Sequence, residues 1–155
     1  MNGKTKLRID TFSVKAGNQQ SDSASTHILE APSRRLQRAR GSLYVLIETL
    51  YGTIVPQPLY GDLARAVADS FYELSGSVTR ALREAILAAN DRLYERNVRA
   101  DTEHQVVVGL NCIVIREDDV YIGQLGPALV SLVQNGTVER YPQDSVWLRT
   151  ATPGV

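Results

Sequence analysis

The side chains that could do chemistry are few and lie far apart in this sequence. It contains one cysteine and two histidines. Cys112 lies in an apolar, β-branched run, so we interpret it as a small buried hydrophobic residue rather than a reactive thiol. His27 and His104 have no partner at the spacing of metal ligands, and we interpret each as a surface histidine rather than a ligand or a base. These three residues predict no catalytic centre.

Two further groups of polar residues lie in the first part of the chain. Ser21, Ser23 and Ser25 have no accompanying His or Asp pattern that would activate a hydroxyl group. Residues 30–40 contain four arginines, which could bind an anion: Arg34, Arg35, Arg38 and Arg40. Neither aromatic residues nor a phosphate cradle accompanies them, so we interpret this segment as a solvated loop. With the Gly-, Asn-, Gln- and Ser-rich residues before it, the pattern predicts a mobile loop region over 15–40.

The composition argues against several classes of partner. Lysine and arginine total 17, as do aspartate and glutamate, so the net charge is zero. This balance gives no electrostatic support for binding nucleic acid or an anionic membrane. No apolar run reaches the roughly 18 to 20 residues that a membrane span needs. No apolar core follows residues 1–4, so we expect no signal peptide and a cytoplasmic protein.

Most of the predicted strands lie in the second half of the chain. Residues 106–141 read as a meander of short antiparallel strands, and Asn135-Gly136 is a strong signal for a hairpin with a type I′ turn. Residues 43–47 are continuously apolar, which predicts a central strand buried on both faces. Residues 6–14 predict an edge strand, and 27–29 a short strand.

Two amphipathic helices are predicted between these strands. Asp62 is the expected N-cap of the first, near 62–74, because two prolines hold the preceding residues out of a helix. Ser77 is the expected cap of the second, near 78–97. Apolar residues recur at helical spacing in both: Leu63, Val67, Phe71 and Leu74, then Val78, Leu82, Ala85, Ile86, Ala89 and Leu93. This order predicts an α+β fold in which an antiparallel helix pair packs on one face of a largely antiparallel sheet.

Three parts of the chain resemble the metal-dependent protein phosphatases of the 2C type (PPM-type). Residues 41–52 are similar to the family's strand that ends in an Ala-Asp-Gly-Met-Gly-Gly motif. Residues 81–94 are similar to its second helix, which carries an Ala-Asn-x-x-Leu/Ile pattern. Residues 109–111 and 119–129 are similar to Gly-Thr-Thr and to the strand before Val-Gly-Asp-Ser-Arg. The resemblance covers residues 41–141 and implies a phosphatase 2C-like domain.

The resemblance also implies what a functional site would need. The family holds Mg²⁺ or Mn²⁺ with carboxylates, and two such ions activate the water that attacks a phosphate monoester. The bridging aspartate of the family falls on Glu48, and the next glycine, whose carbonyl is a ligand, falls on Thr49. The following glycine pair falls on Tyr51 and Gly52. Glu48 is therefore the one candidate metal ligand, although a strand-end glutamate in solvent or in an ion pair is the simpler interpretation.

The other motif positions have no carboxylate to offer. The family's Asp, Ser and Arg fall on Pro127, Ala128 and Leu129. Its N-terminal Arg-x-x-Asn-x-Asp motif has no clean counterpart near Asp22 or Ser25, and its C-terminal metal-binding aspartates would lie beyond Val155. Residues 150–155 resemble a chain cut in a loop. We expect one domain over 1–155, either complete or truncated at the C-terminus.

These departures favour a catalytically inactive phosphatase 2C-like domain, a pseudophosphatase with a binding or regulatory role and no cofactor. The alternative is a divergent Mn²⁺- or Mg²⁺-dependent protein serine/threonine phosphatase that uses Glu48, and an unrelated α+β module is a third interpretation. The complete family fold stacks two sheets. A sheet face lined by residues such as Val45, Ile113 and Ile122 would then be only partly covered. Because large apolar patches mark interfaces, we expect a homodimer or a protein partner.

Overall fold

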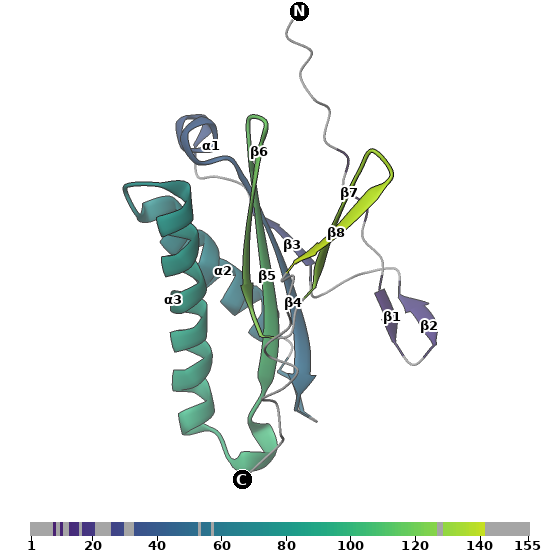
Figure 1. The fold of residues 1–155 in the computed structure, drawn as a ribbon. Helices are drawn as coiled ribbons and strands as arrows, with labels where there is room; N and C mark the ends of the chain where they lie inside the picture. Colours follow the sequence, from purple (N-terminus) through teal and green to yellow (C-terminus); the bar gives the residue numbers. More distant parts are fainter. Residues whose placement is uncertain are drawn as a thin grey trace, which may run out of the picture.

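The computed structural model describes residues 8, 10, 13–15, 17–20, 26–29, 33–52, 54–56, 58–126 and 129–141 (Figure 1). Its helices and strands follow one another in this order: β1 (Ser13–Lys15), β2 (Asn18–Gln20), β3 (Thr26–Leu29), α1 (Arg34–Arg40), β4 (Ser42–Tyr51), α2 (Leu59–Glu73), α3 (Val78–Arg99), the 3₁₀ helix η1 (Thr102–His104), β5 (Val107–Arg116), β6 (Asp119–Leu125), β7 (Val130–Gln134) and β8 (Thr137–Tyr141).

The central sheet has four antiparallel strands in the order β3-β4-β5-β6. β4 pairs with strands on both sides, which confirms the prediction of a central strand over residues 43–47. β3 confirms the short strand expected at 27–29. The sheet and its helices confirm the predicted α+β class.

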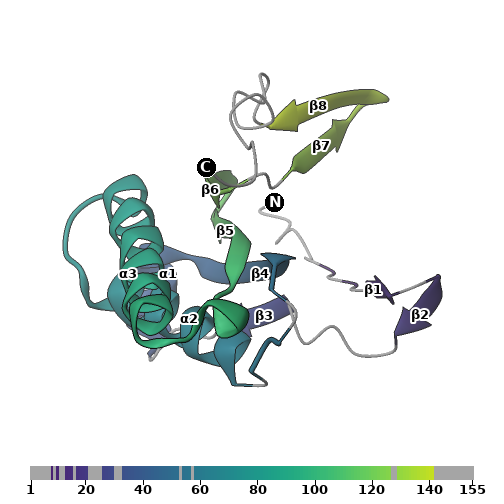
Figure 2. The same ribbon diagram turned by 90° about the horizontal axis from the view of Figure 1, so that it is seen from below.

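Both long helices cover the same face of this sheet, as predicted. A short loop joins α2 to α3, and the two helices pack against each other as a helical hairpin. Figure 2 shows them on one side of the sheet, with the β1–β2 and β7–β8 hairpins lying away from them. Phe71 and Leu63 of α2 are fully buried, and so are Ala81 and Ala85 of α3. The apolar stripes read from the sequence therefore form the core.

The start of one helix was predicted wrongly and the start of the other correctly. α2 begins at Leu59, with Pro58 as its N-cap, so Asp62 lies in the first turn instead of capping the helix. Proline is tolerated there because the first amide groups of a helix have no partner within it. Ser77 caps α3 as expected, since its Oγ accepts a hydrogen bond from the Arg80 amide at 3.2 Å.

The two faces of β4 are not equally buried, which corrects the prediction of burial on both faces. Leu43, Val45 and Ile47 point toward the helices and are 0% exposed, whereas Tyr44 and Leu46 between them are only half-buried. We call the side that α2 and α3 cover the helix face. Val45 belongs to this face and was wrongly grouped with Ile113 and Ile122.

The opposite side of the sheet, which we call the open face, follows from the strand register. Residues directly across antiparallel strands share a face. Tyr44 pairs with Ile113, which pairs with Ile122, and these three side chains are half-buried. The open face is formed by alternate residues of three strands: Ser42, Tyr44, Leu46 and Glu48 of β4, Gly109, Asn111, Ile113 and Ile115 of β5, and Val120, Ile122 and Gln124 of β6.

The two small hairpins correct the predicted meander. β5 and β6 are adjacent in the central sheet, but among the described strands β7 and β8 pair only with each other. The Asn135-Gly136 turn is confirmed, with φ angles of 50° and 79°. An edge strand was expected over residues 6–14, but the strand β1 begins at Ser13 and pairs with β2. Arg8 and Asp10 lie outside any strand. The other residues of 6–12 lie outside the described residues.

The region 15–40 was expected to be a loop apart from the short strand at 27–29, and that prediction is wrong for two elements. Both β2 and α1 fall within this region. Ser33 caps α1, because its Oγ accepts a hydrogen bond from the Leu36 amide at 3.2 Å. Arginine is also a good helix former, so a polar composition did not distinguish helix from loop here.

No helix in the described part of the chain is both long enough and apolar enough to cross a membrane.

Candidate functional site

The candidate site lies at one end of β4, where Glu48 is exposed on the open face. Glu48 is directly across from Gly109 of β5. Gly126, just after β6, packs against the same place, since a Cβ atom added to it would lie 3.3 Å from Gly109 Cα and 3.5 Å from a Leu50 methyl group. The structure therefore brings together segments that lie more than 60 residues apart in sequence, as 48 and 109 do.

Of the residues after Glu48, Leu50 reaches back to Gly109 and Gly126, whereas Thr49 does not share this face. Thr49 faces α2, and its hydroxyl forms a hydrogen bond with the Tyr60 hydroxyl. The pairing of β4 with β5 is irregular between Thr49 and Tyr51, and the Tyr51 side chain is 69% exposed. Gly52 has a φ of 132°, and a Cβ atom there would lie 3.1 Å from the Gln105 carbonyl oxygen. Any other residue at this position would have a strained backbone and a close contact, which explains the glycine.

Beside Gly109 on the open face is a buried polar contact. Asn111 is 6% exposed, and its Oδ1 accepts a hydrogen bond from Gln124 Nε2 at 3.0 Å. Gln124 Nε2 also donates to the Tyr141 carbonyl oxygen at 3.2 Å. This contact attaches the end of β8 to the central sheet, and sequence analysis did not identify it. Its only signal in the sequence is a polar residue at an otherwise apolar strand position.

A metal site would need several oxygen ligands converging on one point. Among the described residues, no group of three or more His, Cys, Asp or Glu side chains is arranged to hold a metal ion. Pro127 and Ala128, aligned with the family's Asp and Ser, lie outside the described residues, as do Asp22, the loop serines and residues 150–155. Leu129 is 59% exposed.

Cys112 and the two histidines are the other side chains that the sequence analysis considered for chemistry. Cys112 is 0% exposed on the helix face, and burial raises the pKa of its thiol to about 12. A thiol that stays protonated is a poor nucleophile, so the prediction of a buried hydrophobic residue is confirmed. His104 is exposed in η1, as expected. The backbone of His27 lies in β3, and its side chain is not among those that the structure describes.

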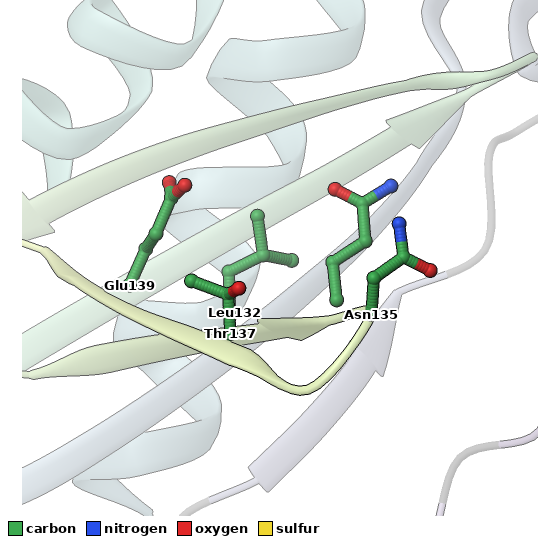
Figure 3. A pocket seen from close by; sticks show the side chains of 5 residues that line it. Leu132, Asn135, Thr137 and Glu139 are labelled. Carbon is green, nitrogen blue, oxygen red and sulfur yellow. The ribbon is translucent and has the colours of Figure 1, made fainter.

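A shallow pocket of about 200 Å³ lies on one face of the β7–β8 hairpin (Figure 3). Leu132, Thr137 and Glu139 project from the two strands, and Asn135 projects from the turn. Glu139 is the one charged residue in this lining, and its carboxylate accepts a hydrogen bond from the Tyr141 hydroxyl at 2.6 Å. That bond raises the pKa of Tyr141, because it favours the protonated hydroxyl. The pocket thus offers a single carboxylate that already has a partner.

The arginines of α1 are placed very differently from one another. Arg34, Arg35 and Arg38 are exposed, but Arg40 is 6% exposed. The prediction of a solvated loop therefore fails at Arg40, which is four residues after Leu36 and so lies on the apolar side of the helix.

The fold itself has a counterpart among solved structures. The chain is similar to the crystal structure of the serine/threonine phosphatase PstP/Ppp of Mycobacterium tuberculosis, with a TM-score of 0.53 and 15% sequence identity. The chain has a phosphatase 2C-like fold. The match covers 92% of this chain and 55% of the phosphatase, so the chain spans about half the length of that protein. No protein-family model and no curated protein matches the sequence.

Three positions that the sequence analysis aligned with motifs of the resembling family lie near one another in the structure. Glu48, Gly109 and Gly126 come from the first and third resembling segments, and they meet at one end of the sheet. Only Glu48 of these three has a side chain that could bind a cation.

Proposed function

We propose that this chain is a phosphatase 2C-like domain that does not hydrolyse phosphate esters and that acts by binding another protein. The observation that carries the proposal is the environment of Glu48. The strand ends that meet there bring one exposed carboxylate together with two glycines, Gly109 and Gly126. The two residues that follow Gly126 in the sequence are Pro127 and Ala128, and neither residue type has a carboxylate group.

The chemistry of metal-dependent phosphate hydrolysis is demanding. Two metal ions must orient a water molecule and neutralise the charge that develops on the phosphoryl oxygens. Each ion takes about six oxygen ligands, and several of these must come from protein carboxylates to give useful affinity. Glu48 alone would bind Mn²⁺ or Mg²⁺ as weakly as any surface acid. We therefore propose that no metal cofactor belongs to this chain.

The alternative is a divergent Mn²⁺- or Mg²⁺-dependent serine/threonine phosphatase in which Glu48 is one ligand of a set that the described residues do not complete. The fold supports either function, because a scaffold does not determine activity. The two proposals differ in one measurable property, which is metal binding that depends on Glu48.

The test combines calorimetric titration of Mn²⁺ with turnover of a small aryl phosphate at millimolar Mn²⁺ or Mg²⁺. Glu48→Ala removes the candidate ligand, and Asp91→Ala is the control, because Asp91 is an exposed carboxylate on α3. We expect no metal-dependent turnover and the same weak Mn²⁺ binding in the wild type and both variants. Turnover that Glu48→Ala abolishes and Asp91→Ala preserves would replace our proposal with the alternative.

The binding role that we propose uses the open face. Tyr44, Ile113 and Ile122 are half-buried there, and Val120 is 54% exposed. Contiguous apolar surface of this kind is typical of protein interfaces. The occupant that we propose is an apolar face of another protein, either a different protein or a second copy of this chain.

A further inference from the structure

At the opposite end of β4 from Glu48, α1 and the end of α2 enclose an open cleft of about 520 Å³. Glu48 lies six positions after Ser42 in β4, which corresponds to about 20 Å along the strand. The cleft is therefore separate from the candidate site. Leu36 of α1 and Tyr72 and Leu74 of α2 supply apolar surface to its lining.

Arg40 lines this cleft although it is 6% exposed. Its Nη1 group donates hydrogen bonds to the Gly76 and Ser77 carbonyl oxygens at 3.0 and 3.2 Å. Both carbonyls belong to the turn between α2 and α3. These two bonds hold the guanidinium group against the helical hairpin. The Arg40 side chain is therefore fixed in position, unlike a flexible arginine on the surface.

The rest of the Arg40 guanidinium has no partner in the described part of the chain. A guanidinium group has five N–H donors, and the two on Nη1 can serve the two carbonyls. The Nε and Nη2 edge makes no hydrogen bond to a described residue, and no described carboxylate forms an ion pair with Arg40. A buried charge without a counter-charge is costly. Two parallel N–H groups along one edge match the oxygens of a carboxylate or a phosphate.

The other polar groups that line the cleft do not cancel the positive charge of Arg40, so the cleft favours an anionic ligand. The Tyr72 hydroxyl lies 3.3 Å from the carbonyl oxygens of Leu29 and Gly41, so it is already engaged, and burial raises the pKa of this group. Arg35 and Glu73 also line the cleft and are exposed. Their opposite charges largely offset each other, which leaves Arg40 as the buried charge.

We propose that this cleft is a binding site for an organic oxyanion, in which the Nε and Nη2 edge of Arg40 holds a carboxylate or phosphate group and the apolar walls hold the body of the ligand. The proposal does not depend on catalysis at Glu48. It predicts that phenyl phosphate and benzoate bind more tightly than inorganic phosphate, because only the first two can bury apolar surface against Leu36 and Leu74.

The experiment is a titration of isotope-labelled protein followed by NMR, with phenyl phosphate, benzoate and inorganic phosphate as probes, in buffer that contains a metal chelator. We expect saturable shifts of the amide signals of Gly41, Gly76 and Ser77, and none at Gly109 or Gly126. Phenyl phosphate binding without benzoate binding would identify a phosphate site, and the reverse would identify a carboxylate site.

Three variants test the role of Arg40. Arg40→Lys keeps the charge but loses the paired N–H groups, and we expect the affinity to fall about tenfold. The matched control is Arg38→Lys, an exposed residue of the same helix, for which we expect no change. Glu73→Gln removes the negative charge at the cleft and should tighten binding by about twofold. This gain of affinity is independent of any loss of stability in Arg40→Lys.

Amide shifts that do not saturate at tens of millimolar probe would overturn the proposal. Equal losses for Arg40→Lys and Arg38→Lys would also overturn it, because they would indicate diffuse attraction to the arginines of α1.

Discussion

Both faces of the central sheet carry apolar side chains, but the two faces are covered to very different extents. On the helix face, Leu43, Val45 and Ile47 are completely buried under α2 and α3. On the open face, their neighbours Tyr44 and Leu46 remain half-buried. The difference shows that a single helical hairpin is enough to build one core. The open face carries apolar side chains without the same cover, together with polar residues that include Glu48.

This contrast separates residues that fold the domain from residues that are available for function. The central side chains of the helix face, such as Leu43, Val45 and Ile47, are already fully used in packing. Side chains on the open face can contact another protein with little rearrangement. Three predictions test the contrast, and they are given in order of decreasing effect on the free energy of unfolding.

The largest effect is expected from deleting a buried side chain on the helix face. Ile47→Ala should destabilise the protein by about 3–4 kcal/mol, because it removes fully buried methyl groups and leaves a cavity. The matched change on the open face, Ile113→Ala, should cost about half as much, because Ile113 is half-buried. Urea unfolding followed by circular dichroism measures both values. Equal losses would mean that the two faces are equally packed.

A smaller effect is expected from adding a methyl group to one glycine on each face. A Cβ atom at Gly123 would lie 2.6 Å from the Ile86 Cδ1 atom of α3, so Gly123→Ala should destabilise the protein by about 1–2 kcal/mol. At Gly109 the nearest atom would be a Leu50 methyl carbon at 3.6 Å, an ordinary contact. Gly109→Ala should therefore be neutral, or stabilising by about 0.5 kcal/mol.

The Ile86→Val background provides the control for this pair. Shortening Ile86 should reduce the cost of Gly123→Ala and leave the effect of Gly109→Ala unchanged. If the two glycine substitutions have the same effect in the wild type, α3 does not approach the sheet as closely as the structure indicates.

The smallest effect on stability is expected at an exposed residue of the open face. Val120→Lys should change the free energy of unfolding by less than about 0.5 kcal/mol, because Val120 is 54% exposed. It should nevertheless weaken self-association and the binding of a hydrophobic dye, if a second copy covers the open face. Analytical ultracentrifugation at micromolar concentration measures the first property.

Val98→Lys is the matched control, since Val98 is 65% exposed on α3. It should leave both association and dye binding unchanged. A wild-type protein that sediments as a monomer and binds no dye would contradict a role for the open face in self-association.

The sequence determined those features that depend on local interactions. Ser77 caps α3 because its hydroxyl reaches an amide only three residues away, and Asn135-Gly136 turns the chain because both residues accept a positive φ. The helical apolar stripes were equally readable, because each stripe repeats within one helix. The central position of residues 43–47 followed from their continuous apolar run.

The tertiary structure decided what depends on contacts between distant segments. The apolar run 43–47 does not reveal which of its residues face the helices, because both sets are apolar, and Val45 was therefore placed on the wrong side. The burial of Arg40 depends on a turn 36 residues later in the chain. The meeting of Glu48, Gly109 and Gly126 depends on the register of β4, β5 and β6, and register is fixed by long-range packing.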